Sequence, residues 1–221
     1  MEKQWTADEL REMARQLGNP SGEGGIKTAE MMNISNQGMI ANTIALLDIQ
    51  PGDQILEIGP GNGKHVASVL DSFDSVYYTG MDISETMIAA AHALNAESVL
   101  AGKATFTLSN GKTIPFSAHT FDKIFTVNTV YFWKNPLQYA TEIYRVLKPN
   151  GTFNMSLATQ EFMEKLPFTI YGFKLYNKNT ISKLVVKAGF QLIDVHEQID
   201  ITVGRLGQPV EREILILKCT K

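Results

Sequence analysis

An acidic residue followed by three glycines at alternate positions is the most chemically suggestive feature of this 221-residue sequence. The pattern occupies residues 55–64, with Glu57 ahead of Gly59, Gly61 and Gly63. A short apolar run ends at the first glycine, so the segment resembles a strand, a turn and the start of a helix. Glycines there let a ligand approach the backbone, and free amides at a helix start attract an anionic group. We therefore expect a ligand site at this turn.

Two common nucleotide-binding loops do not fit this segment. A phosphate-binding loop, G-x-x-x-x-G-K-[ST], would need glycine at Ile58 and a hydroxyl residue at His65. A dinucleotide fingerprint, G-x-G-x-x-G, fails because Lys64 stands at its third glycine. Glu57 would also repel a pyrophosphate, whereas it would suit a ligand with a cationic amino group.

A second carboxylate, Asp82, ends the next apolar run, 25 residues after Glu57. A carboxylate at the end of the second strand of an open α/β sheet commonly accepts hydrogen bonds from a ribose diol. The two acids together favour a nucleoside ligand that carries an amine.

The elements that position these residues alternate between strand and helix after residue 50. Hydrophobic periodicity predicts strands at 54–58, 75–81, 104–108, 121–127, 152–157, 191–195 and 213–218. It predicts helices at 6–17, 35–47, 63–71, 84–100, 136–147 and 180–188. Four glycines and a proline predict irregular structure over 18–25. The alternation favours a parallel-dominated sheet with helices on both faces.

With these motifs in place, the chain resembles a class I S-adenosylmethionine-dependent methyltransferase of the group that mostly acts on small molecules. Besides the two acidic motifs, the segments at 113–116, 144–151 and 188–190 resemble family motifs, in the family's order. The resemblance covers about residues 50–221. It implies a Rossmann-like, doubly wound α/β fold with a mostly parallel seven-stranded sheet. We expect a cofactor-binding domain at 51–221 and an N-terminal helical appendage or lid at 1–50.

The resemblance assigns S-adenosylmethionine as the cofactor and gives roles to ten residues. Those expected to contact the methionine portion are Glu57, Gly59, Gly61, Gly63 and Asn128. Those expected to contact the adenosine are Asp82 at the ribose, Ile83 and Met87 against adenine, and Asn110 and Gly111 beside the ring. Asn110 stands where the family usually has aspartate, so we expect an uncharged acceptor for the adenine amino group. A simple turn role for Asn110 is an open alternative.

No compelling general base is visible, although Tyr131 and His65 are candidates for a catalytic role. Methyl transfer from a sulfonium needs alignment more than acid–base help, because the cofactor carries the activation. Tyr131, Phe132 and Trp133 follow the fourth strand and should face the acceptor, where aromatic rings favour a flat or apolar molecule or stabilise a cation. The alternative is that one or two of them belong to the core.

Two segments could cover the site. Residues 18–25 would act as a flexible joint that lets 31–36 close over the cofactor, and an equally open alternative is a helix packed on the sheet. The aromatic-rich segment 160–176 could form a second cover.

Composition argues against nucleic-acid, metal and membrane partners. The balance of 20 basic and 23 acidic residues gives a net charge of −3, without a basic stripe for nucleic acid. Cys219 is the single cysteine, the start is polar, and no apolar run reaches the ~20 residues that span a bilayer. We expect a cytoplasmic protein with no metal, nucleic-acid or membrane partner, and the sequence carries no signal for an oligomeric state. The leading function is methyl transfer to a small-molecule acceptor; the alternatives are a cofactor-binding regulator or partner subunit without transfer activity, and an NAD enzyme.

Overall fold

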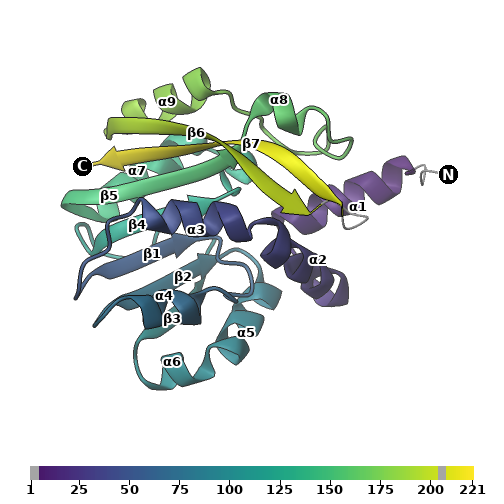
Figure 1. The fold of residues 1–221 in the computed structure, drawn as a ribbon. Helices are drawn as coiled ribbons and strands as arrows, with labels where there is room; N and C mark the ends of the chain where they lie inside the picture. Colours follow the sequence, from purple (N-terminus) through teal and green to yellow (C-terminus); the bar gives the residue numbers. More distant parts are fainter. Residues whose placement is uncertain (1–4, 204–207) are drawn as a thin grey trace.

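The computed structural model describes residues 5–203 and 208–221, which fold around one seven-stranded sheet (Figure 1). The strand order is β3-β2-β1-β4-β5-β7-β6. The strands are β1 (Gln54–Ile58), β2 (Tyr77–Asp82), β3 (Ala104–Leu108), β4 (Phe121–Val127), β5 (Leu147–Ala158), β6 (Gln191–Val203) and β7 (Pro209–Thr220). All pairings are parallel except those of β7, which runs antiparallel to both neighbours. The predicted mostly parallel, doubly wound sheet is confirmed.

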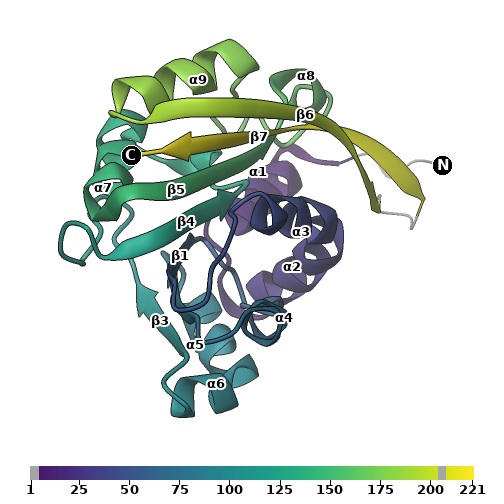
Figure 2. The same ribbon diagram turned by 60° about the vertical axis from the view of Figure 1, so that its left-hand side comes forward.

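Helices cover both faces of the sheet (Figures 1 and 2). They are α1 (Ala7–Gly18), α2 (Gly22–Ser35), α3 (Gln37–Ala45), α4 (Val66–Ser72), α5 (Glu85–Leu94), α6 (Ala96–Leu100), the 3₁₀ turn η1 (Val130–Phe132), α7 (Pro136–Val146), α8 (Gln160–Met163) and α9 (Lys178–Lys187). One buried cluster joins the sheet to α7 and α9, and the other joins it to α3, α4 and α5. The carboxyl ends of the parallel strands therefore emerge between two helical layers.

The prediction of one continuous helix over 84–100 is wrong, because the segment forms two helices, α5 and α6, that are separated at Asn95. The Asn95 side chain donates hydrogen bonds to the carbonyls of Gly63 and Ala91, both at 3.0 Å. The break thus ties the glycine loop to α5, a tertiary demand that local propensity does not reveal.

The irregular segment predicted over 18–25 is also wrong, because α2 begins at Gly22. A Cβ atom on Gly25 would lie 2.7 Å from the carbonyl carbon of Pro20, so glycine permits a close approach there. The Gln16 side chain accepts a hydrogen bond from the Ser21 amide at 2.8 Å, which replaces a helical bond at the corner. These glycines serve a tight corner between two helices.

The helix α3 belongs to the layer that covers the sheet. Met39, Leu47 and Ile49 are buried in the same cluster as Ile55 of β1. The Asn154 side chain on β5 donates to the carbonyl of Thr43 at 3.0 Å. A lid role therefore remains a prediction for α1 and α2, which precede this packed segment.

The last two strands are much longer than predicted. Beyond residue 197 in β6, Ile199 and Ile201 are exposed while Asp200 and Thr202 are buried. This reverses the usual rule that apolar residues face inward, so the apolar–polar alternation over 199–203 fits a strand but would bury the wrong face of it. The far part of the β6–β7 hairpin contacts α2 and α3 (Figures 1 and 2).

Candidate cofactor site

The glycine loop lies at the point where the strand order reverses between β1 and β4, which is where ligands bind in open α/β sheets. Gly59, Gly61 and Gly63 have φ values of 78°, 58° and 65°, a left-handed conformation that favours glycine. A Cβ on Gly59 would lie 2.4 Å from the Thr129 side chain, whereas one on Gly61 would meet open space. The loop is therefore tight against the protein at its start and open at its centre.

Glu57 lies beneath this loop, with its side chain only 2% exposed. Its carboxylate accepts a short hydrogen bond from the Tyr78 hydroxyl and one from His65 Nε2 at 2.6 Å. Burial acts to lower the pKa of His65, but the Glu57 charge and hydrogen bond outweigh it, so this pKa is raised. Burial and the Glu57 charge raise the pKa of Tyr78 well above its usual range. His65 is thus committed to Glu57, and the pair braces the loop from within.

Asp82 ends β2 beside the loop and is 8% exposed. One carboxylate oxygen accepts from the Gly61 amide at 3.1 Å, and the other from the Ser84 amide at 2.9 Å. Burial raises the pKa of Asp82 to about 6, and these backbone hydrogen bonds limit the rise. Each oxygen retains a lone pair, so the carboxylate can accept two further hydrogen bonds.

The residues predicted to surround adenine divide into two groups. Ile83 is 41% exposed and a Cβ on Gly111 would lie 3.3 Å from its side chain, so these two form an open apolar ledge. Met87 is fully buried and supports α5 from within. The Asn110 side-chain oxygen accepts from the amides of Lys112 and Thr113, at 2.8 and 2.9 Å, which fits the turn alternative.

A cavity of about 640 Å³ opens from this ledge toward α1. Its lining residues are Arg11, Ala14, Arg15, Gly18, Asn19, Ile83, Ser109, Asn110, Gly111, Phe132, Lys134, Tyr171 and Gly172. Ser109 was not singled out from the sequence; its hydroxyl accepts from the Gly111 amide at 3.1 Å and so shapes the turn. Its place between a strand end and Asn110 is the only sequence signal that could have indicated it.

Only Phe132 of the three predicted acceptor-facing aromatics lines the cavity. Tyr131 is buried, and its hydroxyl donates to the carbonyl of Ala158 at 3.0 Å; burial raises the pKa of Tyr131, so it does not suit a general base. Trp133 is buried and donates to the Thr129 hydroxyl at 3.2 Å. Tyr131 and Trp133 therefore belong to the core.

Asn128 follows β4 in the left-handed conformation, with φ of 57°. Its side-chain nitrogen donates to the Asn36 oxygen at 3.1 Å, and its oxygen accepts from the Ala158 amide at 3.3 Å and lies 3.2 Å from the Tyr131 hydroxyl. The structure therefore joins Asn128 to the α2–α3 junction, a contact that the sequence did not predict.

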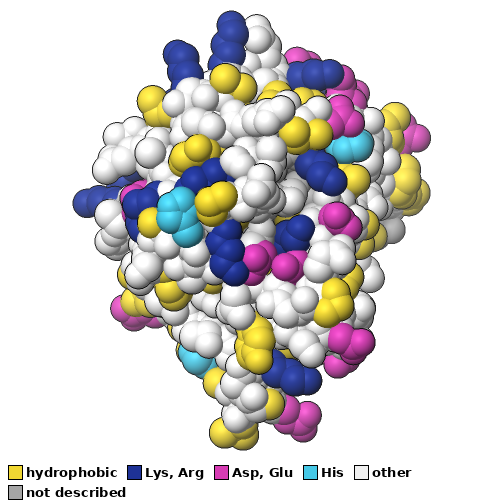
Figure 3. All heavy atoms as spheres, turned by 90° about the vertical axis from the view of Figure 1, so that its left-hand side faces the viewer, with side chains coloured by type: hydrophobic (Ala, Val, Ile, Leu, Met, Phe, Trp, Pro, Cys, Tyr) yellow, Lys and Arg dark blue, Asp and Glu magenta, His cyan; other side chains and the backbone are white. Residues whose placement is uncertain are grey.

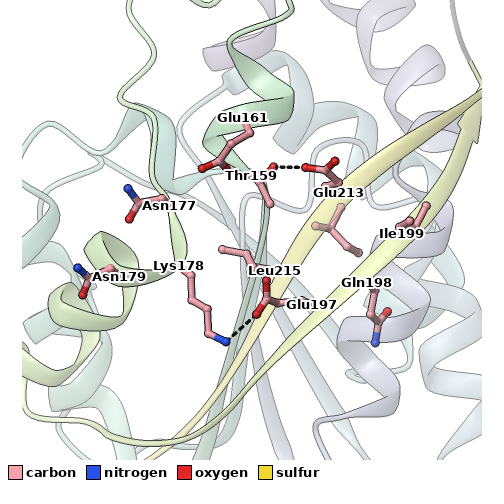
Figure 4. A pocket seen from close by; sticks show the side chains of 11 residues that line it. Thr159, Glu161, Asn177, Lys178, Asn179, Glu197, Gln198, Ile199, Glu213 and Leu215 are labelled. Carbon is pink, nitrogen blue, oxygen red and sulfur yellow. Dashed lines mark hydrogen bonds and ion pairs between the residues drawn. The ribbon is translucent and has the colours of Figure 1, made fainter.

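A second groove, of about 570 Å³, lies between the β6–β7 hairpin and the start of α9 (Figure 4). It shares no lining residue with the cavity under α1. Within it, Lys178 forms an ion pair with Glu197 at 2.6 Å, and Glu213 accepts a hydrogen bond from the Thr159 hydroxyl at 3.4 Å. None of the predicted site residues lines it, so the crevice at β1 and β2 is the candidate cofactor site.

The comparisons with known proteins agree with this geometry. A family described as a methyltransferase domain matches residues 56–155. An uncharacterised methyltransferase of Bacillus subtilis, YdaC, is 30% identical over 75% of this chain and 86% of its own length. The chain belongs to the class I S-adenosylmethionine-dependent methyltransferases. S-adenosylmethionine is the cofactor of this family.

Two further relatives are informative. The demethylmenaquinone methyltransferase of Symbiobacterium thermophilum is 32% identical over 75% of this chain and 69% of its own length. A Haloferax volcanii methyltransferase, solved with the Trm112 methyltransferase activator, superposes with a TM-score of 0.75 over 98% of this chain and 99% of its own, at 17% identity. The second likeness shows that the whole architecture, including the N-terminal helices, recurs in another methyltransferase fold.

Neither membrane nor metal features stand out in the part of the chain that the structure describes. No helix there is both long and apolar enough to cross a bilayer. No group of three or more His, Cys, Asp and Glu side chains gathers there in a way that could hold a metal ion. On the face turned away from α1, basic and acidic side chains lie side by side (Figure 3).

Proposed function

We propose that this methyltransferase transfers the methyl group of S-adenosylmethionine to a small, flat acceptor that carries an anionic group, bound in the cavity under α1. The observation that carries the proposal is the composition of the cavity wall. Its charged lining residues are Arg11, Arg15 and Lys134, with no acidic side chain among the lining residues.

The chain's own residues fit the cofactor. The open backbone at Gly61 leaves room for a ligand, and Asp82 keeps two acceptor positions for ribose hydroxyls. Ile83 and Gly111 offer a flat ledge for adenine. Bound S-adenosylmethionine would supply a methyl group on a sulfonium, which an acceptor lone pair displaces while the electrons of the broken bond stay on sulfur.

Aromatic rings beside the middle and the end of α1 favour a flat acceptor. A Cβ on Gly18 would lie 2.8 Å from the Phe132 ring, so the end of α1 packs directly on that ring. About two turns earlier on the helix, the Arg11 guanidinium lies 5.2 Å from the centre of the Tyr171 ring. The helix therefore roofs the space between Phe132 and Tyr171, where it excludes water and aligns an acceptor.

Lys134 is the strongest candidate for the anion contact. Arg11 pairs with Asp8 at 2.9 Å and Arg15 with Glu12 at 2.7 Å, so acids outside the cavity partly neutralise both. Among the residues that the structure describes, 5–203 and 208–221, Lys134 forms no ion pair. Its ammonium can attract a carboxylate or another oxyanion.

The cavity wall also favours an acceptor that needs no enzymic base. None of its lining residues is Asp, Glu or His. An amine, or an oxygen that ionises near neutral pH, can react under these conditions and lose its proton to water.

The test is transfer of a labelled methyl group from S-adenosylmethionine to pairs of aromatic compounds that carry an amine or an acidic hydroxyl and differ only in a carboxylate or a neutral amide. We expect transfer to the acids, and Lys134→Met should raise their KM about three- to tenfold, as expected for one charge-assisted contact. Lys183→Met, an exposed lysine on α9 outside the cavity, is the matched control and should change nothing. Equal use of acids and amides would contradict the acceptor class. Cofactor binding without transfer to any compound would favour a non-catalytic role.

A further inference from the structure

A buried ion pair joins the two strands of the β6–β7 hairpin where the hairpin passes the α2–α3 junction. Arg212 and Asp200 are paired across the strands, with 2.6 Å between their nearest atoms and side chains 7% and 5% exposed. A Cβ on Gly38 would lie 2.3 Å from the Asp200 carboxylate, so α3 approaches the pair as closely as a glycine allows. A buried charge is costly unless its hydrogen bonds are satisfied, so the other hydrogen-bond partners of Arg212 indicate its role.

Arg212 directs its remaining donors to the junction between α2 and α3. One terminal nitrogen donates to the carbonyl of Ser35 at 2.7 Å, at the end of α2. The other donates to the side-chain oxygen of Asn36 at 3.1 Å. Because a guanidinium has donors only, it dictates that Asn36 turns its oxygen toward the arginine.

That orientation passes from Asn36 to Asn128. The same Asn36 oxygen accepts from the Asn128 side-chain nitrogen at 3.1 Å. The Asn128 oxygen must then face the other way, where it accepts from the Ala158 amide at 3.3 Å and lies 3.2 Å from the Tyr131 hydroxyl, whose one proton it shares with the Ala158 carbonyl. We call this chain of hydrogen bonds, Arg212–Asn36–Asn128, the relay. Each residue in it fixes the side-chain orientation of the next, so the Arg212 guanidinium on β7 determines which end of the Asn128 side chain faces the turn after β4.

The relay ends beside the cavity. The Tyr131 and Phe132 ring centres are 6.2 Å apart, and Phe132 is a cavity wall. We propose that Arg212 is a positioning residue that acts through Asn36 to hold the Asn128 turn in its left-handed conformation against the cofactor. This inference rests on the proposed function, because it assigns the turn after β4 to the cofactor site.

The experiment compares three substitutions that differ in whether the relay survives. Asn36→Leu breaks the relay and leaves the Arg212–Asp200 pair and the Ser35 contact in place. Asn36→Asp keeps an oxygen acceptor for both donors, so it is the conservative rescue. Thr202→Val removes another bond between the hairpin and the junction, from the Thr202 hydroxyl to the Ser35 carbonyl at 2.8 Å, and leaves the relay intact.

The readout is the affinity for S-adenosylmethionine by calorimetry at 25 °C, beside the melting temperature of each variant. We expect Asn36→Leu to weaken binding about three- to tenfold, the effect of losing one or two hydrogen bonds that hold the turn. Asn36→Asp and Thr202→Val should stay within about twofold of the wild type, even where Thr202→Val lowers the melting temperature as much.

Wild-type affinity in Asn36→Leu, or an equal loss in Thr202→Val, would overturn the positioning role and leave a purely structural ion pair. The double variant Arg212→Met with Asp200→Leu removes the charge without orphaning its partner, and it should weaken binding as Asn36→Leu does. A wild-type protein that fails to bind the cofactor would instead refute the proposed function.

Discussion

Two regions meet at the carboxyl edge of the sheet, and they are built in opposite ways. In the glycine-loop region, the contacts join residues near in sequence: Gly61 and Asp82 are 21 positions apart, and Glu57 and His65 are eight apart. In the junction region, Arg212 reaches Asn36 across 176 positions, and Asn36 reaches Asn128 across 92. The first region can therefore carry a short sequence motif, whereas the second exists only after the chain has folded.

The regions also differ in how they treat charge. Asp82 accepts only backbone amides and keeps capacity for a ligand. Arg212 and Asp200 satisfy each other and leave little for anything outside the protein. We expect substitutions in the junction region to affect folding first, and substitutions in the glycine-loop region to affect the cofactor first.

The largest expected effect is the loss of the Arg212 charge. Arg212→Met leaves Asp200 buried without its partner, and such changes destabilise a protein by about 3–5 kcal/mol. Denaturant unfolding would measure it. Lys178→Met on α9 is the control, because it breaks an exposed pair with Glu197 of the same hairpin and should cost less than about 1 kcal/mol. An equal loss in the free energy of unfolding for the two variants would contradict the structural role given to the buried pair.

A smaller effect, on cofactor binding and not on folding, is expected from the loss of the Asp82 carboxylate. Asp82→Ala removes charged hydrogen bonds to the ribose and should weaken S-adenosylmethionine binding by roughly 1–3 kcal/mol. The free energy of unfolding should change less than in Arg212→Met, because only backbone amides lose a partner. Calorimetric titration checks the binding, and unchanged affinity would show that the ribose assignment is wrong.

Cofactor binding should also depend on pH through Asp82. Its pKa is raised by burial to about 6, and only the ionised carboxylate accepts hydrogen bonds at both oxygens. Affinity should therefore be constant well above pH 6 and fall by up to about tenfold per pH unit below it, as one proton competes with the ligand. In Asp82→Asn the affinity should be lower and this dependence should disappear. A profile identical to that of the wild type would assign the titration to another group, with His65 the first to test.

The smallest effect on folding is expected from removal of α1. The helix α1 contributes no residue to either buried cluster of the sheet, so deletion of residues 1–19 should preserve the circular dichroism spectrum and cooperative unfolding. Acceptor turnover should fall, because the cavity loses its roof. Loss of cooperative unfolding would mean that α1 is part of the core and no lid.

Much of the glycine-loop region could be predicted because its chemistry is local. Strand ends, glycines and acids stand in a fixed order, so the sequence alone predicts where Asp82 and the glycines lie, and their contacts with the cofactor stay a prediction. Tyr131 and Trp133 could not be separated from Phe132, because burial in a short turn depends on packing against Tyr139 and Phe173. In the outer half of the β6–β7 hairpin, the alternation over 199–203 fits a strand, but the burial of its polar face depends on packing against α2 and α3 and cannot be predicted locally.

The proposed cofactor site requires that a nucleoside sulfonium lie between the ends of β1 and β2. A crystal structure with S-adenosylhomocysteine tests this most directly. We expect the two ribose hydroxyls within hydrogen-bond distance of the Asp82 carboxylate and the adenine against Ile83. A ligand bound elsewhere, with the Asp82 carboxylate still held only by the Gly61 and Ser84 amides, would contradict it.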